Sequence, residues 1–324
     1  MGRDELTYLS RADVSALLPP PLELVGDIEV MFEHKACGQA EMPPKLGVHF
    51  DDAAFIHAMP ASVREMDAVG VKWVAAFPAN AQQGLPQISA LIILNDPATG
   101  IPYAILDGAE ITAARTAAVS TLSARYLARA GVESLGVLGC GVQGRSHVRA
   151  FREEFGLRRI VAYDVSIEAL QRFTAEMAEE CDIEIVPAST ARDAVVDCDL
   201  VVTAGPITSP PHGTIRKDWL GPGACAISID YGSYWDAEAL EQMDVLCTDD
   251  VRQFVSHREN GHLMGMPDIE LDLADLVHAR ETRTGDPEKR AFACNLGIAL
   301  ADVAVAKRIV MRAIEDGVGI RLPR

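Results

Sequence analysis

A glycine-rich segment near the middle of the chain has the spacing that binds a nucleotide pyrophosphate. Apolar residues at 135–138 predict a strand, and a G-x-G-x-x-G pattern follows it directly, before a predicted helix. In that context the first glycine permits a tight turn, the second lets the backbone approach a phosphate, and the third lets the helix pack on the strand. The residues of this segment predicted to bind a cofactor are Gly139, Gly141, Val142, Gln143 and Gly144.

Asp164 stands where a nucleotide-binding unit of this type recognises the ribose. It follows the next predicted strand, residues 160–163, and lies 25 residues after Gly139. A carboxylate at about that separation hydrogen-bonds the 2′-hydroxyl of NAD and would repel the 2′-phosphate of NADP. Val165 and Ser166 place no cation beside it, so the sequence favours NAD. A strand-to-helix turn that binds no ligand is the alternative.

The end of a later predicted strand offers a second contact for the cofactor. Residues 200–203 lead from an apolar run into the small residues Thr203, Ala204 and Gly205. Small residues at the carboxyl end of a parallel strand leave room for a dinucleotide. We therefore expect Thr203 and Ala204 to contact the cofactor, and a plain strand-to-loop turn is an equally good interpretation.

Asp230 is the candidate catalytic acid or base. It ends the apolar run 224–229, at the carboxyl end of a predicted parallel strand. Open α/β sheets bind their ligands at that edge, and a carboxyl group there can accept or donate a proton. Capping of a turn before Tyr231 and Gly232 is the more frequent use of aspartate in general.

Two basic residues lie in apolar surroundings, where a charge needs an anionic partner. Arg115 falls on the apolar stripe of a predicted helix, and Lys72 interrupts the apolar strand 71–77. Each could hold the carboxylate of a substrate. The alternatives are an internal salt bridge for Arg115 and an edge-strand lysine that discourages aggregation for Lys72.

The histidines give weaker signals. His57 lies in an apolar run, and such a histidine is more often a hydrogen-bonded structural residue than a catalyst. The separation of His257 and His262 suits a zinc site, but no paired cysteines accompany them. We therefore predict no metal.

The elements that position these residues change character along the chain. An N-terminal region with helical spacing is followed by short apolar runs typical of antiparallel strands, and then by an Ala-rich helix that stops at Gly131. From Ser134 onward, strand-like runs alternate with helix-like segments, which predicts β-α-β units, and an amphipathic helix closes the chain. The predicted ranges are 1–36 for the helical region, 55–59, 71–77, 88–94 and 101–106 for the antiparallel strands, and 109–129 and 292–314 for the two helices.

These patterns predict an α/β protein of two domains. One is a Rossmann-type domain with a doubly wound parallel sheet over residues 126–292, and the other is an α+β domain built from residues 1–125 and 293–324.

The composition excludes several classes of partner. The net charge of −18 repels nucleic acid and anionic lipid. Neither a signal peptide nor a run of 18 apolar residues is apparent, so we expect a cytoplasmic protein that does not enter a membrane. Seven scattered cysteines without a C-x-x-C pair are expected to be small buried apolar residues.

Taken together, the motifs resemble those of the ornithine cyclodeaminase/mu-crystallin family, and the resemblance runs along most of the chain. The stretches that carry it are Met42-Pro43-Pro44-Lys45, Lys72 with Phe77-Pro78, Gly84-Leu85-Pro86, the helical segment 112–118 around Arg115, and the glycine segment with Gln143 and His147.

The resemblance implies an N-terminal dimerisation and substrate domain, completed by the C-terminal helix, beside an NAD-binding Rossmann domain. It implies a homodimer as well. In that family Lys45, Lys72 and Arg115 would hold the substrate carboxylate, and Asp230 matches the catalytic aspartate beside the nicotinamide. The implied chemistry is hydride transfer at the α C–N bond of an amino or imino acid.

Three residues depart from the pattern of ornithine cyclodeaminases at the expected substrate site. Lys45 replaces an arginine, Gln87 replaces a threonine, and His57 replaces the glutamate that faces the distal amine of ornithine. Since an imidazole holds an ammonium poorly, the resemblance favours an NAD-dependent amino-acid dehydrogenase or imine reductase. Its substrate would be small or dicarboxylic, such as alanine, aspartate or iminosuccinate. A cyclodeaminase-like lyase and a non-catalytic protein that binds a nucleotide or small ligand are the alternatives.

Overall fold

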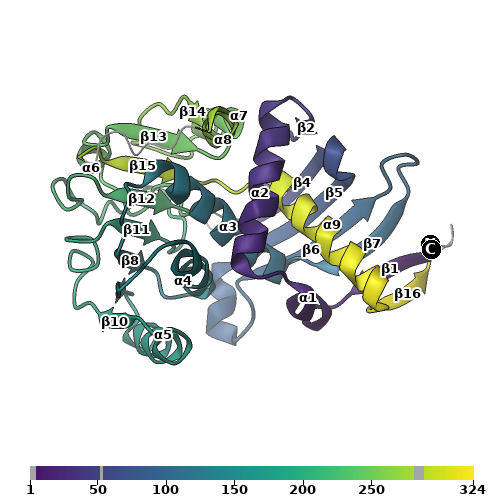
Figure 1. The fold of residues 1–324 in the computed structure, drawn as a ribbon, viewed down its shortest axis with the longest axis horizontal. Helices are drawn as coiled ribbons and strands as arrows, with labels where there is room; N and C mark the ends of the chain where they lie inside the picture. The colour runs from purple at the N-terminus through teal and green to yellow at the C-terminus, as the bar shows by residue number, and fades with distance from the viewer. Residues whose placement is uncertain (1–4, 52–53, 281–287) are drawn as a thin grey trace. The chain divides into compact units, whose positions relative to one another are not determined.

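The computed structural model describes residues 5–51, 54–280 and 288–324. The chain divides into two compact units: unit 1 comprises Met1–Arg115 and Ile298–Arg324, and unit 2 comprises Thr116–Gly297 (Figure 1). The first crossing between them lies inside helix α3 (Ala109–Leu127), and the second follows Gly297. The Ala-rich helix predicted for this region is therefore confirmed.

Unit 1 contains a mixed sheet in which the predicted antiparallel strands form the centre. Successive neighbours run antiparallel, except that β1 runs parallel to β7, and β3 (Leu46–His49) pairs with β4 outside the main order. The strands in spatial order are β16 (Ile320–Pro323), β1 (Glu5–Leu9), β7 (Pro102–Asp107), β6 (Ile88–Asn95), β5 (Ala68–Ala76), β4 (Phe55–Val63) and β2 (Ala40–Glu41).

The prediction of a helical start to the chain is wrong for Glu5–Leu9, which form strand β1. The partners of this strand are β7 and β16, about 100 and 300 residues further along, so no local pattern reveals the pairing. Beyond it the prediction is confirmed. Helix α1 (Arg11–Leu17) begins with a capping box between Ser10 and Asp13, and α2 (Pro21–Ala36) follows.

Helix α9 (Ala299–Asp316) covers one face of the unit 1 sheet, where it packs against β4, β5 and β6. It ends at Gly317, whose φ of 68° is in the left-handed region that favours glycine. The predicted start near residue 292 is wrong, because Ala291–Cys294 form strand β15 of unit 2. Two 3-10 turns, η1 (Arg64–Met66) and η2 (Pro78–Gln83), complete the unit.

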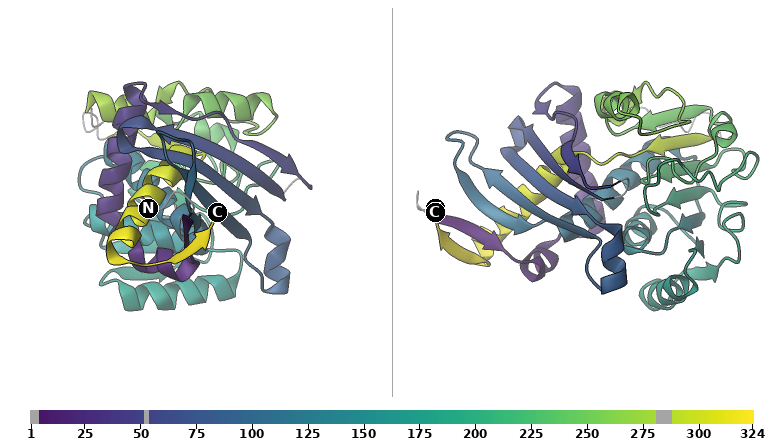
Figure 2. Two further views of the ribbon diagram at one scale, coloured as in Figure 1. Left: turned by 90° about the vertical axis from the view of Figure 1, so that its right-hand side faces the viewer. Right: turned by 180° about the vertical axis from the view of Figure 1, so that it is seen from behind.

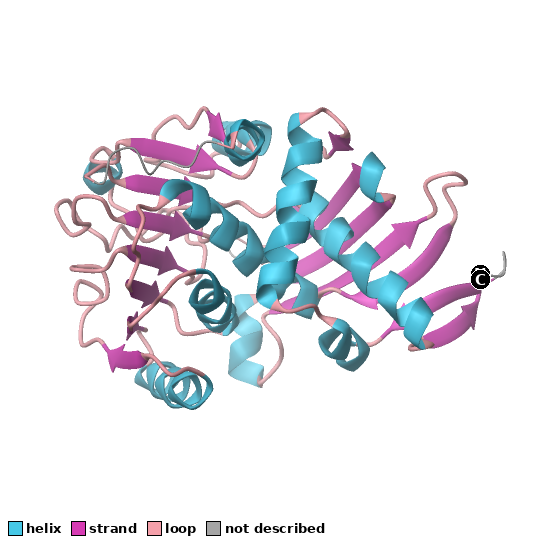
Figure 3. Cartoon of the chain, viewed as in Figure 1, coloured by secondary structure: helices cyan, strands magenta, loops and turns pink. Residues whose placement is uncertain are grey.

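Unit 2 is the predicted Rossmann-type domain, with a sheet whose paired strands are all parallel (Figure 3). From β8 the chain builds outward through β9 to β10, and it then returns to place β11 on the other side of β8. The strands in spatial order are β10 (Glu184–Pro187), β9 (Arg159–Tyr163), β8 (Ser134–Leu138), β11 (Leu200–Thr203), β12 (Cys225–Ser228), β15, β13 (Val245–Thr248) and β14 (Leu271–Asp272).

The reversal of strand order between β8 and β11 is the position at which open α/β sheets bind ligands. Helices connect the strands and bury apolar side chains against them. They are α4 (Val142–Glu154), α5 (Ile167–Glu180), α6 (Ala237–Leu240), α7 (Val251–Glu259) and α8 (Leu273–Ala279).

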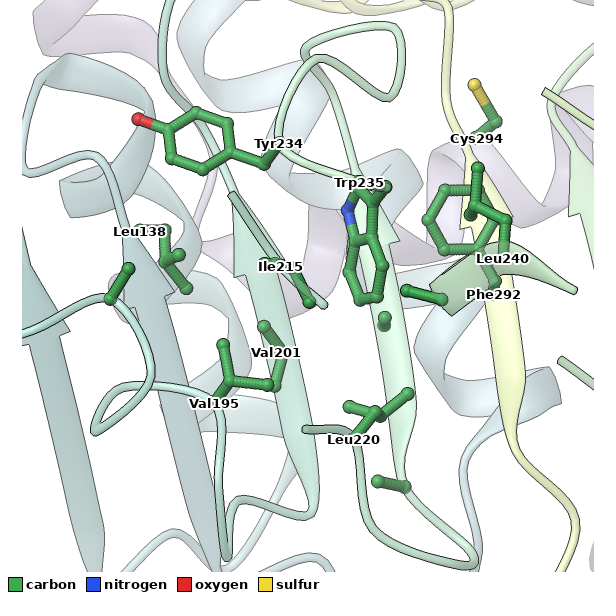
Figure 4. Packing of buried hydrophobic residues seen from close by; sticks show 14 of the residues in the cluster. Leu138, Val195, Val201, Ile215, Leu220, Tyr234, Trp235, Leu240, Phe292 and Cys294 are labelled. Atoms are coloured by element: carbon green, nitrogen blue, oxygen red, sulfur yellow. The ribbon is translucent and has the colours of Figure 1, made fainter. Parts of the chain in front are cut away.

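The core of unit 2 contains strand residues such as Val201 and Phe292, and Tyr234 and Trp235 belong to the same cluster (Figure 4). Six of the seven cysteines are buried as predicted, whereas Cys37 is exposed. Within the described ranges, no helix combines the length and apolar character needed to cross a membrane.

Candidate active site

Three charged side chains meet in the interior of unit 1, and we call them the Asp302 cluster. The carboxylate of Asp302 lies 2.6 Å from Lys72 Nζ through Oδ2, and its Oδ1 accepts a hydrogen bond of 2.9 Å from Arg115 Nε. The side chains of Lys72 and Asp302 are 1% and 0% exposed, and that of Arg115 is 6% exposed. The residues come from strand β5, helix α3 and helix α9.

The position of β5 explains why Lys72 is buried. In the sheet Lys72 lies opposite Met59 on β4 and Ile92 on β6, so β5 is an interior strand. The interpretation as an edge-strand lysine is therefore wrong. Side chains alternate across the strand, and Lys72 lies on the buried face while its neighbour Trp73 lies on the other.

The Asp302 cluster contains two cations and one carboxylate, so it retains one uncompensated positive charge. Arg115 Nη1 is buried and makes no hydrogen bond within the described part of the chain. Desolvation lowers the pKa of Lys72 to about 7, and the charges of Arg115 and Lys45 lower it further, while Asp302 opposes the shift. Such an arrangement can bind the carboxylate of a small molecule.

Lys45, His57 and Gln87, the other residues predicted for the substrate site, all lie on or beside the sheet of unit 1. Lys45 is half-buried just before β3, close enough for its charge to act on Lys72. His57 is buried on the same sheet face as Lys72, opposite Val74, and its ring stacks on Phe55 at 4.1 Å between ring centroids. Gln87 is exposed, and its carbonyl accepts a hydrogen bond from the Phe77 amide beyond the end of β5.

The glycine segment of unit 2 has the predicted geometry. Gly139 follows β8 directly with a φ of 104°, and Gly141 is the residue before helix α4. A Cβ on Gly144 would lie 2.2 Å from the carbonyl oxygen of Gly139, and one on Gly139 would lie 2.7 Å from the backbone of Ala204. A Cβ on Gly141 would meet no atom within 4 Å, so space is open there for a ligand to approach the backbone.

Polar groups on α4 and on the strand ends surround this segment. Asp164, half-buried at the end of β9, accepts hydrogen bonds from the amides of Cys140 and Ser166 at 2.7 and 2.9 Å. Val142 is exposed at the start of α4, and the buried Gln143 Oε1 makes no hydrogen bond to a described residue. Thr203 is fully buried at the end of β11. These groups line the edge at which the strand order reverses.

His147 and Ser120 support the first turn of α4. His147 is buried, and burial lowers its pKa to about 4, so the ring is neutral. Its Nδ1 donates to the carbonyl of Gln143 at 2.7 Å, which leaves Nε2 to accept a hydrogen bond from Ser120 Oγ at 2.9 Å.

Asp230 lies at the carboxyl end of β12 and is 0% exposed. Its Oδ1 accepts a hydrogen bond of 2.7 Å from Ser228 Oγ, whereas Oδ2 is buried and has no hydrogen-bond partner among the described residues. Burial raises the pKa of Asp230 to about 7, and the hydrogen bond from Ser228 opposes that shift. A carboxyl group that titrates near neutrality and has one free oxygen can transfer a proton.

Sequence reasoning missed Asp302, although a signal for it existed. Asp302 lies in the apolar stretch Ala299–Ala306 of the last helix, where every residue is buried. An acidic residue there requires a cationic partner, by the same argument that singled out Arg115. The pairing itself could not be deduced, since 187 residues separate Arg115 from Asp302.

Comparison with known proteins places the chain in a family. Residues 5–317 match the sequence profile of the ornithine cyclodeaminase/mu-crystallin family. The chain belongs to this family. The resemblance in the motifs is therefore confirmed, and the ketimine reductase mu-crystallin of Rattus norvegicus is 28% identical over 91% of each chain.

Two curated relatives match nearly the full length. The nodulation efficiency protein NfeD of Rhizobium meliloti is 32% identical over 96% of this chain and 97% of its own. The alanine dehydrogenase of Archaeoglobus fulgidus is 30% identical over 98% of each chain.

Two solved structures share the fold at 28% identity. The Δ1-pyrroline-2-carboxylate reductase of Thermococcus litoralis, in complex with NADH and L-proline, superposes with a TM-score of 0.88 over 97% of this chain and 99% of that chain. An archaeal alanine dehydrogenase dimer with bound NAD gives a TM-score of 0.87 over 98% and 99%. The predicted fold class is therefore confirmed.

Proposed function

We propose that the chain is an NAD-dependent oxidoreductase that acts at the α C–N bond of a small amino or imino acid. The observation that carries the proposal is the Asp302 cluster, whose buried guanidinium at Arg115 keeps an unpaired donor. The named activities of relatives support it, since they include an alanine dehydrogenase and a pyrroline-carboxylate reductase. In this function unit 1 would bind the substrate, and unit 2 would bind the cofactor and transfer the proton.

The residues of unit 2 fit a dinucleotide. Gly139 and Gly144 pack too closely for a side chain, whereas Gly141 leaves the backbone open to a pyrophosphate. Asp164, at the end of β9, would bind the adenosine ribose and disfavour a 2′-phosphate. Val142, Gln143, Thr203 and Ala204 would complete the site. A bound nicotinamide would accept hydride from the substrate Cα or return it.

Unit 1 would hold the substrate by its carboxylate. Arg115 offers the unpaired Nη1, Lys72 adds a second cation, and Asp302 fixes both side chains in place. Because the cluster is shielded from water, a carboxylate bound there interacts strongly with the guanidinium. Lys45 would contribute charge from the half-buried loop before β3.

Asp230 would exchange a proton with the amino group of the substrate. Hydride can leave Cα only from the neutral amine, so oxidation requires the carboxylate form of Asp230, and imine reduction requires the protonated form. A pKa of Asp230 near 7, raised by burial, makes both forms available at neutral pH.

Alanine, aspartate and iminosuccinate are the substrates we propose first. The uncompensated charge of the Asp302 cluster, together with Lys45, suits an anionic substrate, and a second carboxylate would be accommodated better than a distal ammonium. His57, on the same sheet face as Lys72, is the residue we propose to contact the substrate side chain. Gln87, which lies beside Phe77 beyond the end of β5, would also contact the substrate.

The second partner we propose is another copy of the chain. On the sheet face opposite Lys72, Leu46, Trp73 and Leu91 form one row and are 66%, 52% and 45% exposed. Figure 2, right, shows this sheet from the side away from α9. An exposed apolar surface of this kind marks a protein interface. The alanine dehydrogenase neighbour is described as a dimer, which supports this choice. Sedimentation should show a dimer that Trp73→Lys converts to a monomer, whereas a wild-type monomer would contradict the assignment.

The function is tested by NADH absorbance. We expect alanine or aspartate to reduce NAD stoichiometrically, and pyruvate or oxaloacetate with ammonia to oxidise NADH. Ornithine converted to proline and ammonia without a change in NADH would indicate a cyclodeaminase instead. Binding of NAD without turnover of amino acids, 2-oxo acids with ammonia or amines, or ornithine would leave the non-catalytic alternative.

A further inference from the structure

Tyr234 is a polar residue of unit 2 that sequence reasoning did not single out. It is 6% exposed, and its ring lies in the cluster over the ends of the central strands. Figure 4 shows the hydroxyl directed away from Trp235, toward the side of the sheet where Leu138 ends β8. The strand order reverses between β8 and β11, so the hydroxyl points toward the edge where a dinucleotide binds.

The contacts of the ring fix its position. A Cβ on Gly205 would lie 2.4 Å from Tyr234 Oη and 2.5 Å from Cε2, so the ring rests on the glycine backbone just after β11. The His212 ring meets Tyr234 edge-on, at 4.4 Å between centroids. The segment Ala204–Gly205 also contacts Gly139, so Gly205 connects Tyr234 to the first glycine of the nucleotide-binding segment.

The hydroxyl is free to bind a ligand. None of the described residues forms a hydrogen bond with it, although the side chain is more than nine-tenths buried. Burial raises the pKa of Tyr234, and the charges of Asp230 and Asp164 raise it further, so the hydroxyl stays protonated and acts as a donor. The influence of both carboxylates indicates that the side chain lies within electrostatic range of each.

We propose that the Tyr234 hydroxyl donates a hydrogen bond to the middle part of the dinucleotide, at the nicotinamide-side phosphate or the nicotinamide ribose. This rests on the proposed function, in which Asp164 binds the adenosine ribose and Asp230 acts at the nicotinamide end. A group within range of both carboxylates is expected to reach the second phosphate or the second ribose, which AMP lacks and which ADP-ribose and NAD both contain. Tyr234 is thus a positioning residue for the cofactor.

Calorimetric titration of the full-length protein with AMP, ADP-ribose and NAD tests the inference. Tyr234→Phe should weaken ADP-ribose and NAD about tenfold, as expected for loss of a hydrogen bond to a charged or strongly polar acceptor, and leave AMP unchanged. Gly205→Ala should give the same pattern, because its Cβ would displace the hydroxyl. Tyr103→Phe is the matched control, since it removes a buried unpartnered hydroxyl from unit 1, and it should change none of the three affinities.

Equal affinities of wild type and Tyr234→Phe for ADP-ribose and NAD would overturn the inference while leaving NAD binding intact. An equal loss for AMP would also overturn it, because the effect would then be a general distortion of the site. A wild-type protein that binds none of the three ligands would overturn the cofactor assignment itself, and the inference with it.

Discussion

Unit 1 buries three charged groups that contact one another, whereas in unit 2 the buried carboxylate of Asp230 has an oxygen, Oδ2, with no hydrogen-bond partner among the described residues. In the Asp302 cluster each charge is held by at least one opposite charge within 3 Å. Asp230 has no cationic partner of this kind in the described part of the chain: its Oδ1 accepts a hydrogen bond from the Ser228 hydroxyl, and burial raises the pKa of the carboxyl to about 7.

This difference in pairing suits the two buried sites to different tasks, the binding of an anion and the transfer of a proton. A paired ion cluster keeps its charges at neutral pH and therefore suits the fixed binding of an anion. An unpaired carboxyl loses its charge easily and therefore suits proton transfer. Lys72 lies between these cases, because its pKa is lowered to about 7 even though it is paired.

The largest expected effect is on catalysis by unit 2. Asp230→Asn keeps the size of the side chain and removes proton exchange, so kcat/KM for the amino acid should fall by about 10²–10⁴-fold. Calorimetry should show NAD binding at wild-type affinity. A variant that retains full activity would exclude Asp230 as the acid or base.

The next largest expected effect is on the free energy of unfolding. Asp302→Asn leaves Lys72 and Arg115 without their carboxylate and should reduce the free energy of unfolding by about 3–5 kcal/mol in urea titration. Asp230→Asn is the control, since it removes an uncompensated carboxyl, and it should cost less than about 0.5 kcal/mol or stabilise the protein. Equal losses in the two variants would contradict the distinction between the units.

Within the nucleotide-binding segment, two glycines should respond differently to alanine. Gly141→Ala has open space and a φ of −83°, so it should fold normally and weaken NAD by about tenfold. Gly144→Ala would collide with the Gly139 carbonyl and should reduce stability by about 1–3 kcal/mol. Thermal unfolding and calorimetry separate these effects, and wild-type NAD affinity in Gly141→Ala would argue against close approach of a pyrophosphate.

The smallest effect, a few-fold change near neutrality, is the pH dependence. Oxidation of the amino acid needs ionised Asp230, which is lost as pH falls below about 7, and protonated Lys72, which is lost as pH rises above about 7. The oxidative kcat/KM should therefore pass through a maximum near pH 7. Imine reduction needs both groups protonated, so it should only decline as pH rises through 7. Identical profiles in the two directions would contradict these roles.

The sequence predicted those structural elements whose signals come from residues close together in the chain. The strand, glycine turn and helix around Gly139 lie within 20 residues, and each step has its own local signature. The pairing of β1 with β16 joins the two ends of the chain, and the pairing of Arg115 with Asp302 joins residues 187 positions apart. A charged residue on the apolar face of a helix indicates that an oppositely charged partner is needed, but only the folded structure identifies that partner. Local patterns also could not show that β5 lies inside the sheet.

The fate of the hydrogen on Cα tests hydride transfer most directly. Alanine and aspartate, each deuterated at Cα, are incubated with the protein and NAD, and the NADH formed is analysed by mass spectrometry. Hydride transfer from Cα would place deuterium on the nicotinamide ring with at least one of the two amino acids, and Asp230→Asn should abolish this transfer. NADH that forms without deuterium, or no NADH from either amino acid, would contradict hydride transfer from Cα of these substrates.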